Sequence, residues 1–305
     1  MSSGLIIRLK AFLTILFWGA SFIATKIALR DAHPATIILL RFALGVAILW
    51  FAIWRGRMFQ RVGKRDLVYL AILGFIAVPF HQAIQAAGLL YTTAASMGWI
   101  IALIPIFTAL LAWLFLGEPM TVLKVIGSAI AFCGAVFVVT RGALSLDTFR
   151  LPSTIGDALA VASALNWAIF QVASKPILRR LEPTPAMAYL MLIGGILIVP
   201  FASLQMLSDL PRLTLDGWVA ILFLGIFCSG VGYLVWYDAL SKVDASQLSS
   251  LSYIQPLITV IVAAIFLGES ITPAVLLGGA VILFGVYLVN RSATKHRAGV
   301  SIASD

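Results

Sequence analysis

The polar side chains best suited to bind a small molecule lie inside apolar stretches of this sequence. In the segment AVPFHQAIQAAG, His81 and Gln85 share one helical face and Gln82 lies beside them. An imidazole and two amides are costly inside a membrane, so we expect all three to point inward. Two interpretations are open: the groups contact a substrate, or they satisfy backbone groups disturbed by Pro79. We favour substrate contact because the groups cluster at one depth.

Aromatic and hydroxyl side chains in other apolar stretches extend this set. Ser246, Ser249, Ser250 and Tyr253 follow helical spacing and therefore share one face. That face could instead be a packing surface, because small residues let helices approach closely in lipid. The residues predicted to bind substrate are His81, Gln82, Gln85, Trp99, Asn166, Trp167, Tyr233, Trp236, Ser249 and Tyr253.

The predicted site combines aromatic walls with amide and imidazole donors, and it has no carboxylate at its centre. Such a pocket suits a small, partly apolar molecule, for example an amino acid. Aromatic rings can hold the ammonium group of an amino acid through cation–π contact. If a proton is coupled to transport, His81 is the group at this depth best suited to titrate near neutral pH.

Two glutamates and two lysines lie nearer the ends of the apolar stretches. The phrases FLGEPMT and FLGESIT contain Glu118 and Glu269, and Lys26 and Lys175 lie about one turn from the ends of their stretches. We hypothesise two symmetric gate pairs, Lys26–Glu269 and Lys175–Glu118. Alternatively, the lysines extend to the membrane surface and each glutamate caps the N-terminus of the helix that follows it. For the glutamates we favour the cap.

Pro105 and Pro256 lie near the middle of two apolar stretches. Proline removes one backbone hydrogen bond and frees the carbonyl four residues earlier, here that of Ile101 and that of Ser252. Free carbonyls at membrane depth need protein or water partners, so the breaks either line a cavity or are packing kinks. We favour the cavity because broken helices at mid-membrane form the binding sites of many transporters.

The composition indicates that lipid, rather than water, surrounds most of the chain. Of 305 residues, 62% are hydrophobic and 11% are charged, whereas a soluble domain is about a quarter charged. The mean hydropathy is +1.07. A helix needs about 20 apolar residues to cross a bilayer. We therefore predict an all-α integral membrane protein with ten transmembrane helices, at about 11–30, 35–54, 67–88, 93–116, 121–140, 155–175, 185–205, 217–238, 245–267 and 272–290.

The basic residues orient these spans. With the N-terminus in the cytoplasm, thirteen Lys and Arg residues lie inside and four outside, which favours cytoplasmic placement of both termini in an inner (plasma) membrane. The net charge of +9 therefore follows a membrane rule and is not a sign of nucleic-acid binding. The two cysteines lack metal-ligand spacing, and no cofactor motif or nucleotide-binding P-loop is present. The missing P-loop argues against ATP-driven transport.

The chain contains an internal repeat. An offset of 151 relates Glu118 to Glu269 and Pro105 to Pro256, and an earlier offset of 149 relates Trp18 to Trp167. Each half has five predicted spans, so the second half enters the membrane in the opposite direction, as in the inverted repeats of secondary transporters. We predict one five-helix repeat in residues 1–150, a second in residues 151–291 and a cytoplasmic tail in residues 292–305.

Several segments resemble the ten-span EamA branch of the drug/metabolite transporter superfamily. These are WGASFIATKIAL, HPATIILLRFALG, YTTAASMGWIIALIPIFTALLAWLFLGEPMT and YIQPLITVIVAAIFLGESIT. The resemblance covers nearly the whole chain. It implies export of small metabolites, often amino acids, by ion-coupled or facilitated alternating access. The family transports varied substrates, so the resemblance does not identify the cargo.

We therefore predict a secondary transporter that exports small metabolites, most simply amino acids or related partly apolar compounds, across the lipid bilayer. A carrier of phosphorylated metabolites or nucleotide sugars is the alternative transporter. It requires central basic residues, whereas Lys26 and Arg41 are expected towards the outer side. A non-transporting membrane enzyme requires a polar catalytic cluster, and the three scattered histidines do not provide one. A receptor or scaffold without flux is the remaining alternative.

Overall fold

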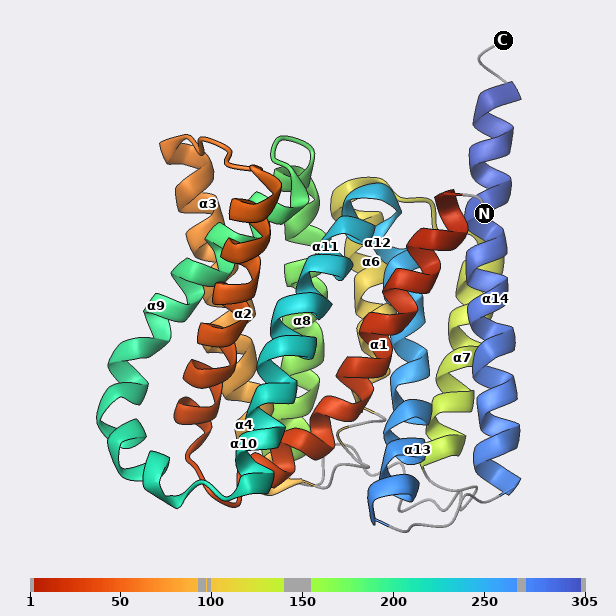
Figure 1. Cartoon of the computed structure of the whole chain (residues 1–305). Helices are drawn as coiled ribbons and strands as arrows, with labels where there is room; N and C mark the ends of the chain where they lie inside the picture. Colours follow the sequence, from red (N-terminus) through yellow and green to blue (C-terminus); the bar gives the residue numbers. More distant parts are fainter. Residues whose placement is uncertain (1–2, 93–96, 98–99, 140–154, 268–272, 303–305) are drawn as a thin grey trace.

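The computed structural model describes residues 3–92, 97, 100–139, 155–267 and 273–302. These residues form a bundle of helices, and the described ranges contain no strand. Both termini lie at the same end of the bundle (Figure 1). We call this end the terminus end; it holds the connections at residues 57–63, 117–121, 179–182 and 243–244. We call the opposite end the far end; it holds the connections at residues 29–33 and 213–214.

The described residues of the first half form six α-helices, and one pair of them is joined through a π-helical segment without a break. In chain order the elements are α1 (Ser3–Ala28), α2 (Pro34–Gly56), α3 (Lys64–Phe75), the π-helix η1 (Ile76–Phe80), α4 (His81–Tyr91), α6 (Ile104–Leu116) and α7 (Val122–Val139).

The second half also has a π-helical segment, and the offset of 151 shows that it is the repeat equivalent of the first. Its elements are α8 (Ile155–Leu178), α9 (Pro183–Asp209), the 3₁₀ turn η3 (Leu210–Arg212), α10 (Leu215–Phe223), the π-helix η4 (Leu224–Gly232), α11 (Tyr233–Lys242), α12 (Ala245–Ser249), the 3₁₀ segment η5 (Ser250–Ile254), α13 (Gln255–Leu267) and α14 (Pro273–Ile302). The last helix includes most of the predicted polar tail.

Seven helical segments of the described chain are long and apolar enough to cross a membrane: Leu9–Ala28, Pro34–Gly56, Lys64–Tyr91, Ile155–Leu178, Pro183–Phe201, Leu215–Lys242 and Ala245–Phe266. Three shorter apolar helices accompany them, Ile104–Leu116, Val122–Phe137 and Leu276–Val289. Together they occupy the ten stretches expected from the sequence. The three shorter helices do not meet the length of a span by themselves, so the count of ten transmembrane helices stays a prediction.

Helices α7 and α14 are equivalent in the repeat, and they pack against each other through paired glycines. A Cβ atom added to Gly127 would lie 2.8 Å from the carbonyl oxygen of Gly285, and one added to Gly134 would lie 2.9 Å from that of Gly278. The offset of 151 relates Gly127 to Gly278 and Gly134 to Gly285. The two contacts are therefore copies of one another, and they require the helices to be antiparallel. Glycine allows this close approach in lipid.

A second pair of contacts shows that the halves interlock. A Cβ atom added to Gly74 in α3 would lie 2.6 Å from the carbonyl oxygen of Leu190 in α9. One added to Gly225 in η4 would lie 3.2 Å from the carbonyl oxygen of Arg41 in α2. The offsets of 149 and 151 relate Arg41 to Leu190 and Gly74 to Gly225. The same helix contact thus occurs twice, each time between one half of the chain and the other.

The glycine contact between α7 and α14 predicts a specific sensitivity to substitution. Gly134→Ala is expected to destabilise the protein by about 1–3 kcal/mol, because the added methyl group overpacks a backbone contact. Gly63→Ala is the control, since a Cβ atom there has nothing within 4 Å. Thermal unfolding of purified protein in detergent measures both. Equal melting temperatures for the two variants would contradict close packing at Gly134.

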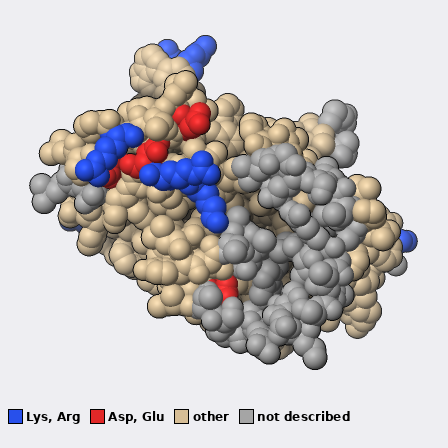
Figure 2. Space-filling model, turned by 90° about the horizontal axis from the view of Figure 1, so that it is seen from below, with Lys and Arg blue, Asp and Glu red and all other residues tan. Residues whose placement is uncertain are grey.

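Carboxylates hold the connections at the far end. The Asp31 carboxylate accepts the backbone N–H and the hydroxyl of Thr214 at 3.0 and 2.6 Å. The Asp209 carboxylate accepts the backbone N–H of His33 at 2.9 Å and the hydroxyl of Thr36 at 2.6 Å. These bonds tie the α1–α2 connection to the start and end of the α9–α10 connection. Figure 2 shows this end, where most of the described acidic and basic side chains in view gather on one side of the face.

Candidate functional site

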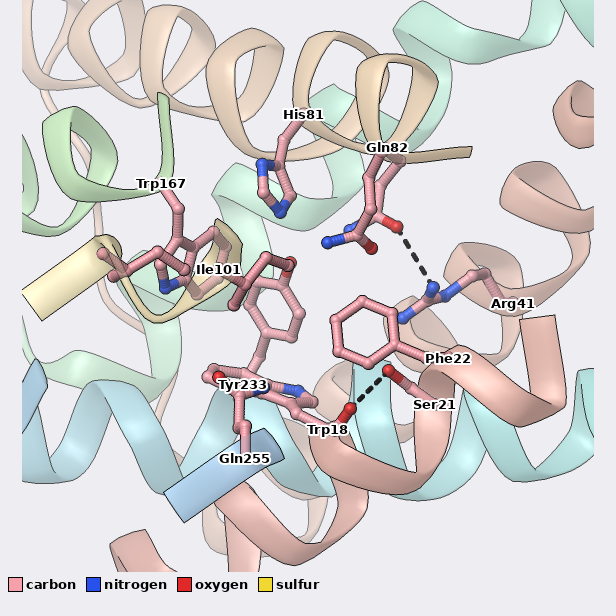
Figure 3. Close-up of a pocket in the computed structure, with 12 residues that line it drawn as sticks. Trp18, Ser21, Phe22, Arg41, His81, Gln82, Ile101, Trp167, Tyr233 and Gln255 are labelled. Atoms are coloured by element: carbon pink, nitrogen blue, oxygen red, sulfur yellow. Dashed lines mark hydrogen bonds between the residues drawn. The ribbon is translucent and has the colours of Figure 1, made fainter. Parts of the chain in front are cut away.

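A central cavity of about 50 Å³ lies between the two halves of the bundle. Aromatic, amide and basic side chains surround it (Figure 3). The lining residues are Trp18, Ser21, Phe22, Arg41, His81, Gln82, Gln85, Ile101 and Ile104 from the first half and Trp167, Tyr233 and Gln255 from the second. A water molecule needs about 10–15 Å³ in this measure. The cavity in this conformation therefore has room for a few waters and not for an amino acid.

Two equivalent tryptophans form the aromatic wall. The offset of 149 relates Trp18 in α1 to Trp167 in α8, and their rings meet edge to face with centroids 5.3 Å apart. The Tyr233 ring packs against both, at 5.6 Å from Trp18 and 5.7 Å from Trp167. Such edge-to-face contacts fix ring orientation as well as contributing packing energy. The repeat thus places one indole from each half on the cavity.

The π-helical segments explain part of this arrangement. A π-helix shifts the backbone hydrogen-bond register and leaves carbonyls that need other partners. The Trp18 indole N–H donates to the Cys228 carbonyl in η4 at 3.2 Å. The Asn166 amide donates to the Ile76 carbonyl in η1 at 3.0 Å. In each half, a side chain from the first helix of the other half donates a hydrogen bond to a backbone carbonyl of the π-helix. These bonds hold α1 and α8, which carry Trp18 and Trp167, in place beside the cavity.

Arg41 is the basic residue of the cavity. Its side chain is 5% exposed, and its guanidinium lies 5.3 Å from the centre of the Phe42 ring. Nε donates to the Ser229 hydroxyl at 3.0 Å, and Nη1 donates to the Gln82 side-chain oxygen at 3.1 Å. Helix α2 supplies Arg41, and η4 and α4 supply its partners, so three elements from both halves fix the guanidinium.

His81 begins α4 directly after the π-helix η1 and lies against the aromatic wall. Its ring centroid is 4.9 Å from that of Trp167, and its Nδ1 atom is 3.4 Å from the Ser163 hydroxyl. Figure 3 shows the imidazole and the neighbouring Gln82 side chain on the same side of the cavity. An imidazole so placed can exchange a hydrogen bond with a ligand in the cavity.

The structure brings five of the predicted binding residues to the cavity: His81, Gln82, Gln85, Trp167 and Tyr233. Four others are buried elsewhere, namely Asn166, Trp236, Ser249 and Tyr253. The Ser249 hydroxyl donates to the Ser246 carbonyl at 3.1 Å, as expected of a packing face. Trp99 lies outside the described residues. The binding role of all ten residues stays a prediction.

Sequence reasoning missed several lining residues. Arg41 was expected nearer the outer side, and the structure places it on the central cavity instead. A basic residue inside an apolar helix is a functional candidate by itself, so the segment LLRFALG could have identified Arg41 as a candidate site residue. Trp18 was detectable too, because the offset pairs it with Trp167. Nothing in the sequence marks Ser21, Phe22 or Gln255.

Both prolines lie in the first turn of a helix that follows a break. Residues 102–103 form a turn before α6, which contains Pro105. The 3₁₀ segment η5 precedes α13, which contains Pro256. Ile101, Ile104 and Gln255 at these breaks line the cavity. The Ser252 carbonyl, expected to be free, accepts the Gln255 backbone N–H because the 3₁₀ turn supplies a donor three residues on.

The glutamate of FLGEPMT caps a helix at the terminus end. Gly117 ends α6 in a left-handed conformation with φ of 68°, which turns the chain sharply. The Glu118 carboxylate then accepts the backbone N–H groups of Ala245 and Ser246 at 2.8 and 3.2 Å, and also the Ser246 hydroxyl. These groups begin α12. The prediction of a cap is therefore confirmed for Glu118, but the expected partner, the helix that follows in sequence, is wrong.

Lys175 binds the other side of the same connection. Its ammonium donates to the carbonyls of Leu240 and Val243 at 2.7 and 2.5 Å, at the end of α11. Lys175 and Glu118 thus hold the α11–α12 connection from two sides, and a direct gate pair between them stays a hypothesis. Lys26 is half-buried in the last turn of α1, whereas Glu269 lies outside the described residues.

The chain matches one family model in both halves. The model of the EamA-like transporter family matches residues 5–140 and again residues 154–291. The two matches together span most of the chain. The repeat detected from the sequence offsets is therefore also a repeat of the family unit.

Curated relatives and a solved structure are similar over nearly the full length. An uncharacterised transporter of Archaeoglobus fulgidus is 32% identical, with 92% of this chain and 96% of the relative covered. A probable terminal-alkyne amino-acid exporter of Streptantibioticus cattleyicolor is 28% identical, with 95% of each chain covered. The crystal structure of a protein that is 22% identical in sequence superposes on this chain with a TM-score of 0.76. The match covers 94% of this chain and 98% of the other, which shows that the two share a fold.

Proposed function

Because the chain belongs to the EamA-like transporter family, we propose that it is a secondary transporter that exports small, partly apolar metabolites by alternating access. Amino acids or related compounds are the proposed substrates. The relative from Streptantibioticus cattleyicolor, named as a probable amino-acid exporter, supports this substrate class. The proposed location is the plasma membrane, with both termini in the cytoplasm, and His81 is the proposed acceptor if a proton is coupled.

The observation that carries the proposal is a central cavity built by both repeats. Equivalent tryptophans from the two halves form its wall, and the polar lining groups converge from α2, α4 and the break before α13. Substrate sites in inverted-repeat transporters lie at the repeat interface near mid-membrane. Aromatic surfaces with a few convergent polar groups suit a small molecule that has both an apolar and a polar part.

The lining is asymmetric in a way that supports alternating access. Phe22, which is 3% exposed, and the half-buried Gln85 line the cavity. Their repeat equivalents Gln171 and Trp236 do not line it and are 0% exposed. Phe22 lies one turn beyond Trp18 towards the far end, and Gln171 lies one turn beyond Trp167 towards the terminus end. In this conformation Gln171 and Trp236, on the terminus side of the cavity, are thus fully packed, whereas Phe22 and Gln85 reach the cavity. Exchanging the roles of the two repeats would bring the terminus-side residues to the cavity instead.

A carrier of phosphorylated metabolites is the second candidate, because Arg41 places a basic group on the cavity, but a lone arginine supports it only weakly. Phosphate groups are usually bound by clusters of Arg and Lys. Arg41 is the one Lys or Arg among the described lining residues, with a leucine at its equivalent position in the other half. A single guanidinium matches a singly charged group better than a phosphate ester.

Counterflow in proteoliposomes tests the proposed function. Purified protein is reconstituted with unlabelled amino acids inside, and uptake of the labelled compound is followed, with hexose phosphates and nucleotide sugars as parallel arms. We expect uptake of at least one amino acid above that of empty liposomes. Uptake confined to the phosphate arms would favour the second candidate, and no uptake in any arm would contradict transport of these solutes.

A further inference from the structure

Arg41 is a buried cation without an acidic partner among the described residues. A guanidinium has five N–H donors. Two of those of Arg41 bond to the Ser229 hydroxyl and the Gln82 amide oxygen, which are neutral. The remaining three have no hydrogen-bond partner among the described residues, and the side chain lines the cavity.

Such an arrangement is costly unless the charge has a further use. Moving a cation out of water carries a penalty that neutral partners offset only in part. Arginine inside a membrane protein is therefore usually paired or functional. Here the repeat shows that the position does not require a cation for packing, because the equivalent Leu190 is fully buried in α9 at the matching helix contact.

We propose that Arg41 binds the carboxylate of the transported metabolite. This inference rests on the proposed function and specifies the chemistry of its substrate. Ser229 and Gln82 act as positioning residues, since each accepts one N–H and fixes the plane of the guanidinium. The guanidinium can then offer two parallel N–H groups to a carboxylate.

The rest of the lining indicates what the other end of the substrate is. The described lining residues include no Asp or Glu, so a cationic group on the substrate has no carboxylate to pair with. The indoles of Trp18 and Trp167 and the Tyr233 ring present faces or edges to the cavity instead. Aromatic faces bind ammonium groups and also apolar side chains. An α-amino acid with an apolar side chain carries groups that match both ends of the cavity, and it would bind in a conformation in which the cavity is larger than the 50 Å³ found here.

The test compares an amino acid with its own carboxamide. The probe is the amino acid with the largest counterflow in the panel above, and its carboxamide competes for uptake. The two compounds have nearly the same shape and share the ammonium group, but only the acid has a carboxylate. Wild-type protein is expected to prefer the acid by about tenfold or more, as a lost charge-assisted pair would cause.

Variants assign this preference to one residue. Arg41→Gln is expected to bring the acid and the amide to within about twofold, and Arg41→Lys to keep part of the preference because it keeps the charge. Arg55→Gln is the control: Arg55 is exposed in the last turn of the same helix. Size-exclusion profiles verify that each variant is folded. If Arg41→Gln fails to fold, the preference of the wild type for the acid over the amide still tests whether the site recognises a carboxylate.

The outcomes separate this inference from the proposed function. Equal competition by acid and amide in the wild type, or an unchanged preference in folded Arg41→Gln, would overturn the role of Arg41 while amino-acid transport stands. Absence of amino-acid counterflow altogether would overturn the proposed substrate class, and the inference with it.

Discussion

Replacing Glu118 with alanine is expected to destabilise the protein strongly and to loosen the terminus end. The Glu118 carboxylate caps α12 through Ala245 and Ser246, and it is 8% exposed. Lys124, which is 4% exposed, donates to the Ser246 hydroxyl at 2.8 Å. Ser246 therefore links a buried acid to a buried base. Removing one member of such a unit leaves the other charge uncompensated, which costs roughly 3–5 kcal/mol.

Thermal unfolding of four proteins in detergent measures this effect: wild type, Glu118→Ala, Lys124→Ala and the double variant. We expect Glu118→Ala to unfold at a clearly lower temperature, and the double variant to be less destabilised than the sum of the single changes, because it removes both charges together. Glu182→Ala is the control, since this exposed glutamate makes no side-chain cap bond to the helix that follows it. Melting temperatures that add without coupling would rule out the Glu118–Ser246–Lys124 unit.

The second large effect concerns the path between the cavity and the terminus end. Gln171 and Trp236 are 0% exposed, and both side-chain polar atoms of Gln171 and the indole nitrogen of Trp236 have no hydrogen-bond partner among the described residues. Thr108 in α6 has a buried unpartnered hydroxyl as well. Unpaired polar groups cost free energy when dry. We predict that water or substrate satisfies them when the terminus end opens.

Cysteine labelling measures this opening. In a background with both native cysteines replaced, Phe22→Cys and Gln171→Cys report on equivalent positions of the two repeats. We expect a small thiol reagent to label Phe22→Cys faster than Gln171→Cys, because Phe22 lines the central cavity although it is only 3% exposed, whereas Gln171 is 0% exposed and does not line it. Adding Glu118→Gln, which removes the charge of the cap, is expected to reverse that order. Slow labelling of Gln171→Cys in every background would show that this region is static core.

Much of the architecture was predictable because the repeat leaves a regular trace. The offset that pairs Gly127 with Gly278 and Gly134 with Gly285 indicates which helices are equivalent, and the odd number of predicted spans in each half makes them antiparallel. That the two helices pack against each other is seen only in the structure. Apolar length located the spans, and proline located the breaks before α6 and α13. Each of these signals acts locally or through a constant register, which is what a single sequence can reveal.

The π-helices and the partners of the end groups were not predictable. A π-helix differs from an α-helix only in hydrogen-bond register, and η1 and η4 share no residue pattern that would reveal it. The cap at Glu118 binds a helix more than 120 residues away in sequence, at Ala245. Such a contact depends on how two repeats meet in space, and sequence spacing does not encode that.

The cavity itself was predictable in part. The amides and imidazole of α4 reach it because polar groups in an apolar helix must point inward. Trp236 and Tyr253 have the same character but are packed away from it, because they lie on the side of the site that is fully packed in this conformation. Sequence predicts which side chains are polar and buried, whereas the conformational state decides which of them face the cavity.

Counterflow by Trp167→Ala is the measurement that tests the central claim most directly, namely that the cavity between the repeats is the substrate site. Trp167 packs against Trp18, His81 and Tyr233. Its replacement is expected to reduce amino-acid counterflow about tenfold or more, by removing the aromatic surface that holds the substrate. The matched control is Trp54→Ala, because Trp54 is 64% exposed on the outer surface of α2. Counterflow that is unchanged in folded Trp167→Ala would contradict the account.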